Sequence, residues 1–201
     1  MAPPTLVLYP GAGSGRDHSS LVAIERRLGR RASVERIDFP YRRGGRRAPD
    51  RAPKLLASIR EDLAGRLATF TGLPVSADSE LIITPGTQGA LFLALGATVT
   101  TGTQVAVLEP DSFANRKLVK FFGGEVVPIP LHYQGAPSEN GPDLKRLEAA
   151  FESDTKVLVF STPNNPTGLV YSGSSIKAIS ELTAKHNVSV IVDQLYSRML
   201  Y

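Results

Sequence analysis

Residues 156–172 read KVLVFSTPNNPTGLVYS, and this stretch decides the fold. Its apolar run, Val157–Phe160, has the length of a strand and ends at a turn rich in Pro, Asn and Gly. Asn165 precedes Pro166, so its backbone is biased toward extended conformations and the turn is stiff. Such a turn either simply redirects the chain or holds the Asn165 amide still beside a ligand.

Similar apolar segments recur along the chain and alternate with helical patterns. The pattern predicts strands over Thr5–Tyr9, Val34–Phe39, Leu81–Thr84, Gln104–Leu108, Glu125–Ile129, Val157–Phe160 and Val188–Val192. It predicts helices over Leu21–Leu28, Leu55–Phe70, Gln88–Leu95, Ala114–Phe122, Leu144–Phe151 and Ser175–His186. The strands are apolar along their whole length, which is typical of a mostly parallel sheet sandwiched between helices. Ligands of such α/β folds bind at the carboxyl ends of the strands.

The composition is that of a water-soluble globular protein. Of 201 residues, 42% are hydrophobic and 21% charged, and cysteine is absent, which excludes disulfides and thiol catalysis. No apolar run approaches the roughly 20 residues that span a bilayer, and the opening residues do not resemble a secretory signal. We therefore expect a cytoplasmic protein that does not enter the membrane.

Positive charge is concentrated at the N-terminal end. Residues 1–54 hold twelve Lys or Arg against five Asp or Glu, whereas residues 55–201 hold eleven against fourteen. Much of the excess lies in YRRGGRRAPDRAPK, residues 41–54. Such a segment either binds a polyanion or forms a solvated loop. Only Tyr41 offers a ring for base stacking, so the sequence argues against a nucleic-acid partner.

Two further strand ends carry residues suited to a ligand. Gly86, Thr87 and Gln88 lie between a predicted strand and a predicted helix, where free amides and the helix dipole favour a phosphate. A tight turn that needs glycine for geometric reasons explains the same residues. Asp193 ends a buried strand, and Tyr196 follows three residues later. The carboxylate either caps a turn or pairs with a cation, and at about 4 Å such a pair contributes roughly 4 kcal/mol at an effective dielectric near 20.

Together these motifs resemble the large domain of fold-type-I, pyridoxal-phosphate-dependent aminotransferases of class I/II. The resemblance runs through ITPGTQGALFLAL, VAVLEPDSFANRKL, STPNNPTG and VIVDQLYS and covers about residues 55–201. It implies that Asn165 and Tyr196 bind the cofactor's ring hydroxyl oxygen and that Asp193 pairs with the pyridinium nitrogen. Gly86, Thr87 and Gln88 would bind the phosphate. The implied reaction transfers an amino group between an amino acid and a 2-oxo acid, within a homodimer.

The sequence departs from that family in three ways. The Schiff-base lysine and the substrate-carboxylate arginine of the family are expected further along than Tyr201, so the chain by itself is expected to be inactive, without catalytic residues of its own. Ser112 stands where the family stacks an aromatic ring on the cofactor. No metal site is expected.

The N-terminal part resembles another family. LVLYPGAGSGRDHSSLVAIE and the segment after it resemble the start of a dienelactone-hydrolase-like α/β-hydrolase, over about residues 2–53. The loop Gly11–Gly15 would supply oxyanion-hole amides, yet the chain has no Gly-x-Ser-x-Gly elbow. We therefore expect two parts of different origin, 1–54 and 55–201, joined in a chimera. An esterase and a polyanion-binding protein remain the alternatives to a pyridoxal-phosphate-binding protein.

Overall fold

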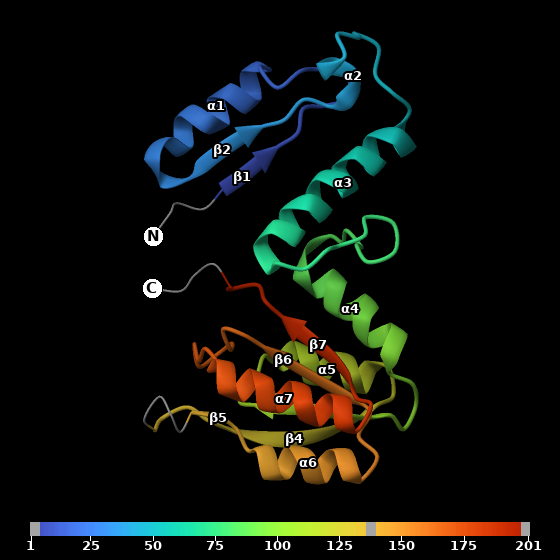
Figure 1. Cartoon of the computed structure of the whole chain (residues 1–201), viewed down its shortest axis with the longest axis vertical. Coiled ribbons are helices and arrows are strands. Elements are labelled where there is room, and N and C mark those ends of the chain that lie inside the picture. Colours follow the sequence, from blue (N-terminus) through green and yellow to red (C-terminus); the bar gives the residue numbers. More distant parts are fainter. Residues whose placement is uncertain (1–4, 136–139, 198–201) are drawn as a thin grey trace. The chain divides into compact units, whose positions relative to one another are not determined.

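The computed structural model describes residues 5–135 and 140–197. The chain forms two compact units, residues 1–83 and 84–201, which we call the N-terminal and C-terminal units and describe separately (Figure 1).

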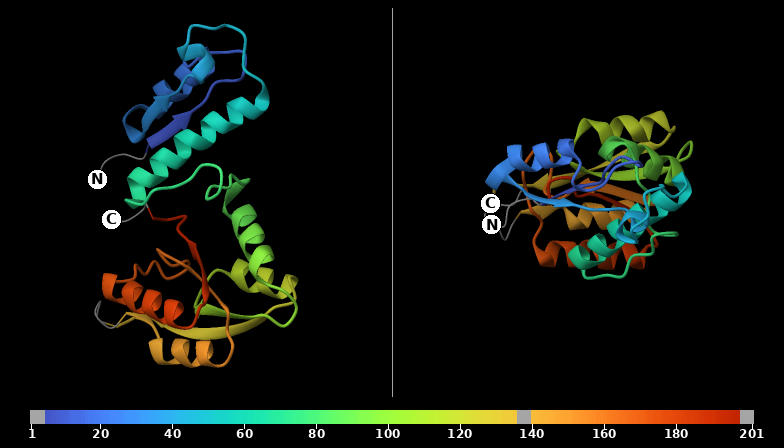
Figure 2. Two further views of the ribbon diagram at one scale, coloured as in Figure 1. Left: turned by 45° about the vertical axis from the view of Figure 1, so that its right-hand side comes forward. Right: turned by 90° about the horizontal axis from the view of Figure 1, so that it is seen from above.

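The N-terminal unit is built on two parallel strands. Strand β1 (Thr5–Leu8) pairs in register with β2 (Ser33–Arg36), and helix α1 (Ser19–Leu28) with the short 3₁₀ helix η1 (Gly29–Arg31) connects them (Figure 2). Two more helices follow, α2 (Pro40–Arg43) and α3 (Ala52–Thr71).

A small aromatic cluster holds this unit together. Phe39, Tyr41 and Leu55 are buried, with Tyr9 and Ile59 packed against them. Leu55, in the first turn of α3, contributes to this core. The predicted helix over Leu55–Phe70 is confirmed as α3.

The described part of the C-terminal unit forms one five-stranded sheet with four helices. Its strands are β3 (Gln104–Glu109), β4 (Glu125–His132), β5 (Gly141–Pro142), β6 (Val157–Ser161) and β7 (Ser189–Asp193). Its helices are α4 (Gly86–Thr98), α5 (Phe113–Phe121), α6 (Leu144–Glu152) and α7 (Gly173–Lys185). The strand order is β5-β4-β3-β6-β7, and all neighbours are parallel except β5, which runs antiparallel to β4. The sheet is therefore mixed.

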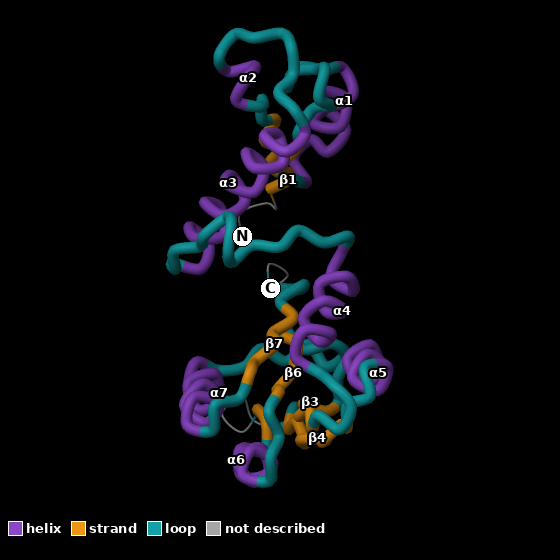
Figure 3. Tube along the Cα trace, turned by 90° about the vertical axis from the view of Figure 1, so that its right-hand side faces the viewer, coloured by secondary structure: helices purple, strands orange, loops and turns teal. Residues whose placement is uncertain are grey.

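Successive side chains of the central strands point to opposite faces of the sheet, so the core has two layers. Ala106 and Leu108 of β3 pack with Leu147 of α6 and Ile179 of α7, whereas Val107 on the opposite face packs toward helices α4 and α5. Figure 3 shows the two helix pairs on opposite sides of the sheet. The prediction of an α/β sheet between helical layers is confirmed for β3 and β6.

Two details of the sequence-based prediction are wrong. Residues 81–84 form no strand, and Ile82 and Ile83 are exposed, because no neighbouring strand pairs with them in the described part of the chain. Strand β7 is not covered on both faces, since Val190 and Val192 remain 41% exposed.

No described helix combines the length and apolarity needed to cross a bilayer.

Candidate functional site

The carboxyl ends of β6 and β7 bring the Asn165 loop and Asp193 to the same edge of the sheet. Ser161 pairs with Asp193 across the two strands, and the backbone N–H of Thr162 donates to the Asp193 carbonyl at 2.9 Å. Both strands continue directly into loops at this edge, as a parallel sheet requires.

The Asp193 side chain is half-buried and only partly engaged. Its Oδ1 accepts a hydrogen bond from the backbone N–H of Leu195 at 3.0 Å. No donor to Oδ2 is found among the described residues, so one carboxylate oxygen caps the turn after β7 and the other is available to a ligand.

Helix α4 begins beside this carboxylate with an open first turn. Gly86 has a φ of +77°, a conformation that favours glycine, and the preceding Pro85 provides no side-chain cap. The first amides of the helix are therefore without intrahelical acceptors, and the half-buried Thr87 belongs to this first turn. This is the arrangement that binds anions at helix N-termini.

A cavity of about 460 Å³ joins the two features. The residues that line it come from the start of α4 and the end of β7: Thr84, Gly86, Thr87, Ala90, Leu91, Ala94, Ile191, Val192, Asp193, Gln194 and Leu195. An anion site and a carboxylate thus lie in one mostly apolar hollow, which is the usual make-up of a small-molecule site. No lysine lines this cavity in the described part of the chain.

Three of the six predicted site residues do not line the cavity. The structure brings Gly86, Thr87 and Asp193 together, whereas Gln88, Asn165 and Tyr196 lie outside its wall. Gln88 is exposed, and the side chains of Asn165 and Tyr196 are half-buried. Within residues 5–135 and 140–197, the amide of Asn165 and the phenol of Tyr196 make no side-chain hydrogen bond.

The two asparagines of the loop differ in kind. Asn164 is 2% exposed, its Oδ1 accepts from the backbone N–H and hydroxyl of Thr167 at 3.2 and 2.6 Å, and its Nδ2 donates to the Pro110 carbonyl at 3.3 Å. Asn164 therefore stabilises the turn itself. The Asn165 side chain, by contrast, makes no hydrogen bond to another described residue.

Sequence reasoning missed one half-buried acid next to this site. Asp111 follows β3, and its carboxylate accepts from Asn115 Nδ2 at 2.7 Å and from the Ser161 hydroxyl at 3.1 Å. Burial raises the pKa of Asp111, and the negative charge of Asp193 raises that pKa further. The signal resembled the one that pointed to Asp193, an acid at or shortly after the end of an apolar strand.

Ser112 and Phe113 have local roles. The Ser112 hydroxyl accepts from the backbone N–H of Ala114 at 3.4 Å and caps α5. Phe113 is 72% exposed, and the Lys117 ammonium lies 4.8 Å from its ring centroid. Phe113 therefore does not replace the aromatic ring that Ser112 lacks.

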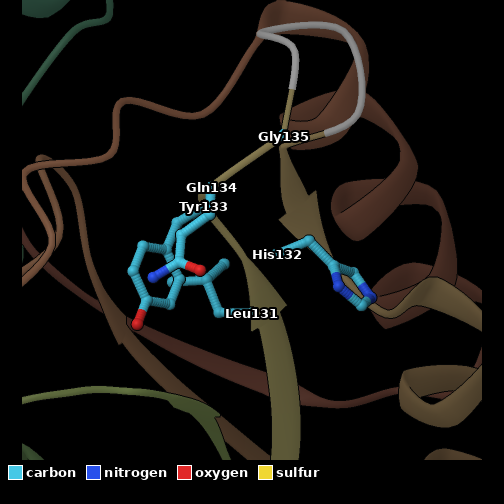
Figure 4. Close-up of a pocket in the computed structure, with 5 residues that line it drawn as sticks. All are labelled: Leu131, His132, Tyr133, Gln134 and Gly135. Atoms are coloured by element: carbon cyan, nitrogen blue, oxygen red, sulfur yellow. The ribbon is translucent and has the colours of Figure 1, made fainter.

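A second hollow, at the end of β4, does not gather reactive groups. Its lining residues are Leu131, His132, Tyr133, Gln134 and Gly135, and its volume is about 310 Å³. Figure 4 shows His132 on the opposite side of the ribbon from Leu131 and Tyr133, as alternation along a strand demands. We do not regard it as a site.

The N-terminal glycine loop lacks the partners of a hydrolase site. The Tyr41 hydroxyl donates to the Ala12 carbonyl and Arg42 Nη2 donates to the Gly13 carbonyl at 3.0 Å, so side chains engage the carbonyls of this loop. His18 Nδ1 lies 2.8 Å from Ser20 Oγ at the start of α1, where it also accepts from the Ser20 backbone N–H. His18 therefore caps helix α1, and no hydrogen bond from its imidazole to an acid is found among the described residues.

The arginine-rich segment is more ordered than a solvated loop. Tyr41 is fully buried, so it offers no ring for base stacking. Arg46 makes a bidentate pair with Asp50 at 3.0 Å for both contacts, and Lys54 lies 3.4 Å from the same carboxylate. Two of the six cations in residues 41–54 therefore share the carboxylate of Asp50.

Comparison with known proteins gives these features a context. Residues 51–201 match the family described as aminotransferase class I and II. The chain is 35% identical over 150 residues to the aspartate/prephenate aminotransferase of Thermus thermophilus, an alignment that covers 74% of this chain and 38% of that protein. It is 31% identical over 157 residues to the human kynurenine–oxoglutarate transaminase 1, covering 74% and 35%.

Solved structures agree. An aspartate aminotransferase from Rhodobacter sphaeroides superposes with a TM-score of 0.70 at 56% identity, over 72% of this chain and 37% of that one. The Thermus thermophilus aspartate aminotransferase with maleate gives 0.66 at 35% identity, over 72% and 37%. The chain therefore spans well under half the length of these relatives. The matched region nevertheless covers most of the chain, including the Asn165 loop, the α4 turn and Asp193, and on that basis the chain belongs to the class I and II aminotransferases, with their fold-type-I α/β fold and a mixed sheet.

Proposed function

We propose that this chain carries the pyridoxal-phosphate-binding part of an aminotransferase that moves an amino group between an amino acid and a 2-oxo acid. Class I/II aminotransferases depend on pyridoxal 5'-phosphate, which acts as an electron sink when bound. The single observation that carries the proposal is the cavity shared by the start of α4 and the Asp193 carboxylate.

Asp193 is proposed to face the ring nitrogen of the cofactor. Its unengaged Oδ2 leaves room for one strong acceptor contact, and the carboxylate is held by the Leu195 amide through Oδ1. A half-buried carboxylate favours the protonated form of a nearby ring nitrogen, because opposite charges attract more strongly where water is partly excluded. Asp193 would thereby hold a proton on that nitrogen.

The start of α4 is proposed to bind the phosphate. The backbone amides that follow Gly86 lack a side-chain cap, and Thr87, a residue with a hydroxyl group, lines the cavity in the same turn. Gln88 is exposed and could approach an anion from the solvent side. Amides, hydroxyl and helix dipole all favour a dianion here.

Asn165 and Tyr196 are proposed to bind the ring hydroxyl oxygen. Each keeps a side-chain donor without a partner in the described structure, at the same edge of the sheet as Asp193. Because neither lines the cavity, we propose that they approach a bound ring from its rim.

Covalent attachment is not part of the proposal for this chain. Amino-group transfer in this family uses a lysine that forms a covalent link and moves a proton, and no lysine lines the described cavity. The chain spans 38% of the Thermus thermophilus relative, so the complete activity, and the choice of amino acid and 2-oxo acid, belong to the whole protein.

The test is titration of the purified chain with pyridoxal 5'-phosphate, followed by absorbance. We expect saturable binding that borohydride does not convert into a covalent adduct on any single lysine, as judged by mass spectrometry. No saturable binding would contradict the proposed function, and a stoichiometric adduct on one lysine would contradict its non-covalent clause.

Three further features belong to the same proposal. A division into parts of different origin, 1–54 and 55–201, is supported by the start of the family match at residue 51 and by the concentration of arginine before it. A homodimer and a cytoplasmic location follow from the resemblance alone. Light scattering on the purified chain tests the dimer.

A further inference from the structure

One hydroxyl group links the half-buried acid Asp111 to the Asn165 loop. The Ser161 hydroxyl donates to Asp111 Oδ1 at 3.1 Å and accepts from the backbone N–H of Asn165 at 3.0 Å. It also accepts from Asn164 Nδ2 at 3.5 Å. A hydroxyl group has one proton and two lone pairs, so all of its hydrogen-bonding capacity is used.

We propose that Asp111 is a positioning residue, which fixes the Asn165 backbone by orienting the Ser161 hydroxyl. This inference rests on the proposed function for its meaning, because Asn165 is there a cofactor-binding residue. The hydrogen-bond chain itself is independent of any cofactor.

The carboxylate is the group that sets the direction of the chain of hydrogen bonds. An ionised carboxylate only accepts, so the Ser161 proton must point at Asp111 and both lone pairs must point at the loop. The second carboxylate oxygen accepts from Asn115 Nδ2 at 2.7 Å, and Asn115 is 1% exposed. The acid is therefore held on both sides and cannot turn away from Ser161.

Burial makes this orientation firm. Ser161 is 3% exposed and lies at the last position of β6, in register with Asp193. Water therefore has little access to replace a lost partner, and a buried hydrogen bond left unmade is costly. Among the charged groups, Asp193 acts on Asp111 and raises the pKa of this acid beyond the effect of burial. Burial also raises the pKa of the Tyr171 phenol, and the negative charge of Asp111 raises it further.

Amide hydrogen exchange at Asn165, followed by NMR on the full chain, tests the proposal without any cofactor. In Asp111→Asn the single amide oxygen cannot serve both Ser161 and Asn115, so the Ser161 proton loses its acceptor or the Asn115 amide does. We expect the exchange rate of the Asn165 amide to rise about tenfold in Asp111→Asn and in Ser161→Ala. The amide of Val107 in β3 serves as the internal reference whose exchange rate should not change. Ser161→Thr keeps the hydroxyl and should restore slow exchange.

The double variant and a matched control sharpen the test. Because both residues act through one hydrogen bond, Asp111→Asn with Ser161→Ala should quicken exchange no more than either alone. Asp143→Asn weakens another acid-to-amide contact, the 3.0 Å cap on Arg146 of α6, and should leave Asn165 unchanged. Unchanged exchange in Asp111→Asn, or additive effects, would overturn the proposal.

A second measurement ties the network to the cofactor. With pyridoxal 5'-phosphate as the probe, Asp111→Asn should weaken binding about tenfold while Asp143→Asn does not. Equal affinity in Asp111→Asn and wild type would overturn the positioning role. If the wild-type chain does not bind pyridoxal phosphate at all but Asn165 exchange responds as expected, the proposed function fails while the hydrogen-bond network stands.

Discussion

Ser161 and Asp193 are paired residues at the ends of two neighbouring parallel strands, and Thr162 donates to the Asp193 carbonyl at 2.9 Å. This pairing fixes where Asp193 lies along the strand direction relative to the start of the Asn165 loop. Any ligand held by Asp193 therefore lies at the edge of the sheet where the loop begins.

Asp193→Asn should weaken pyridoxal phosphate binding by roughly 10- to 100-fold, since a half-buried pair is worth more than an exposed one and less than a fully buried one. The amide keeps an oxygen for the Leu195 N–H, so the fold should be unaffected. Absorbance titration measures the affinity. Glu181→Gln on α7, which removes a surface charge paired with Lys177, is the control. Equal binding by Asp193→Asn and wild type would remove Asp193 from the site.

Gly86→Ala should destabilise the C-terminal unit by about 1 kcal/mol or more, because a φ of +77° is strained for alanine. An added Cβ would meet no atom within 4 Å, so the cost comes from the backbone and not from a clash. Chemical denaturation measures it. Gly173→Ala at the start of α7, which also meets no atom and does not have a positive φ, should cost nothing. Equal effects of the two substitutions would show that the α4 turn does not depend on glycine.

Asp111 should make stability depend on pH in a particular direction. Burial raises its pKa above the ordinary 3.8, so the folded protein binds this proton more tightly than the unfolded chain does. The free energy of unfolding should therefore fall as pH rises from about 3.8 through the raised pKa, and not change further above it. Asp111→Asn should lack this fall. Denaturation series on both proteins at several pH values give the difference, and parallel curves would contradict the raised pKa.

The sequence predicted the sheet well where each strand has neighbours on both sides. Strands β3 and β6 are apolar throughout and are buried on both faces, so pattern and environment agree. The segment 81–84 has the same apolar character but no pairing partner in the described chain, and it forms no strand. A hydrophobic pattern reports a tendency to be buried, whereas a strand also needs a neighbour for its hydrogen bonds.

The site was predictable in part for a related reason. Asp193 and Gly86 were found because each breaks a local pattern, the first as an acid after an apolar strand and the second as a glycine before a helix. Whether Asn165 and Tyr196 line the same cavity depends on how two loops turn after their strands, and local sequence does not determine that turn. Asp111 carried the same signal as Asp193, but its partner Ser161 lies 50 residues away in the sequence.

Ile82→Ala should change the free energy of unfolding by no more than about 0.5 kcal/mol, because the side chain is 72% exposed. Leu158→Ala in β6, where the side chain is fully buried, should cost about 2–5 kcal/mol. Chemical denaturation compares them. A large loss for Ile82→Ala would mean that segment 81–84 is packed in solution, for instance against a second copy of the chain.

Limited trypsin digestion should cut after Arg47 more readily than after Arg46, because Arg46 is held by Asp50 in a bidentate pair while no ion pair of Arg47 is found in the described structure. The expected products end at Arg47 and begin at Ala48, as judged by mass spectrometry of the native protein. Asp50→Asn removes the charge that holds Arg46 and Lys54, so cleavage after Arg46 should quicken in that variant, whereas cleavage at Lys177 on α7 should not. If the segment from Arg42 to Arg51 resists trypsin in the wild-type protein, the picture of two loosely joined parts is wrong, since a protease needs a locally open chain at the joint.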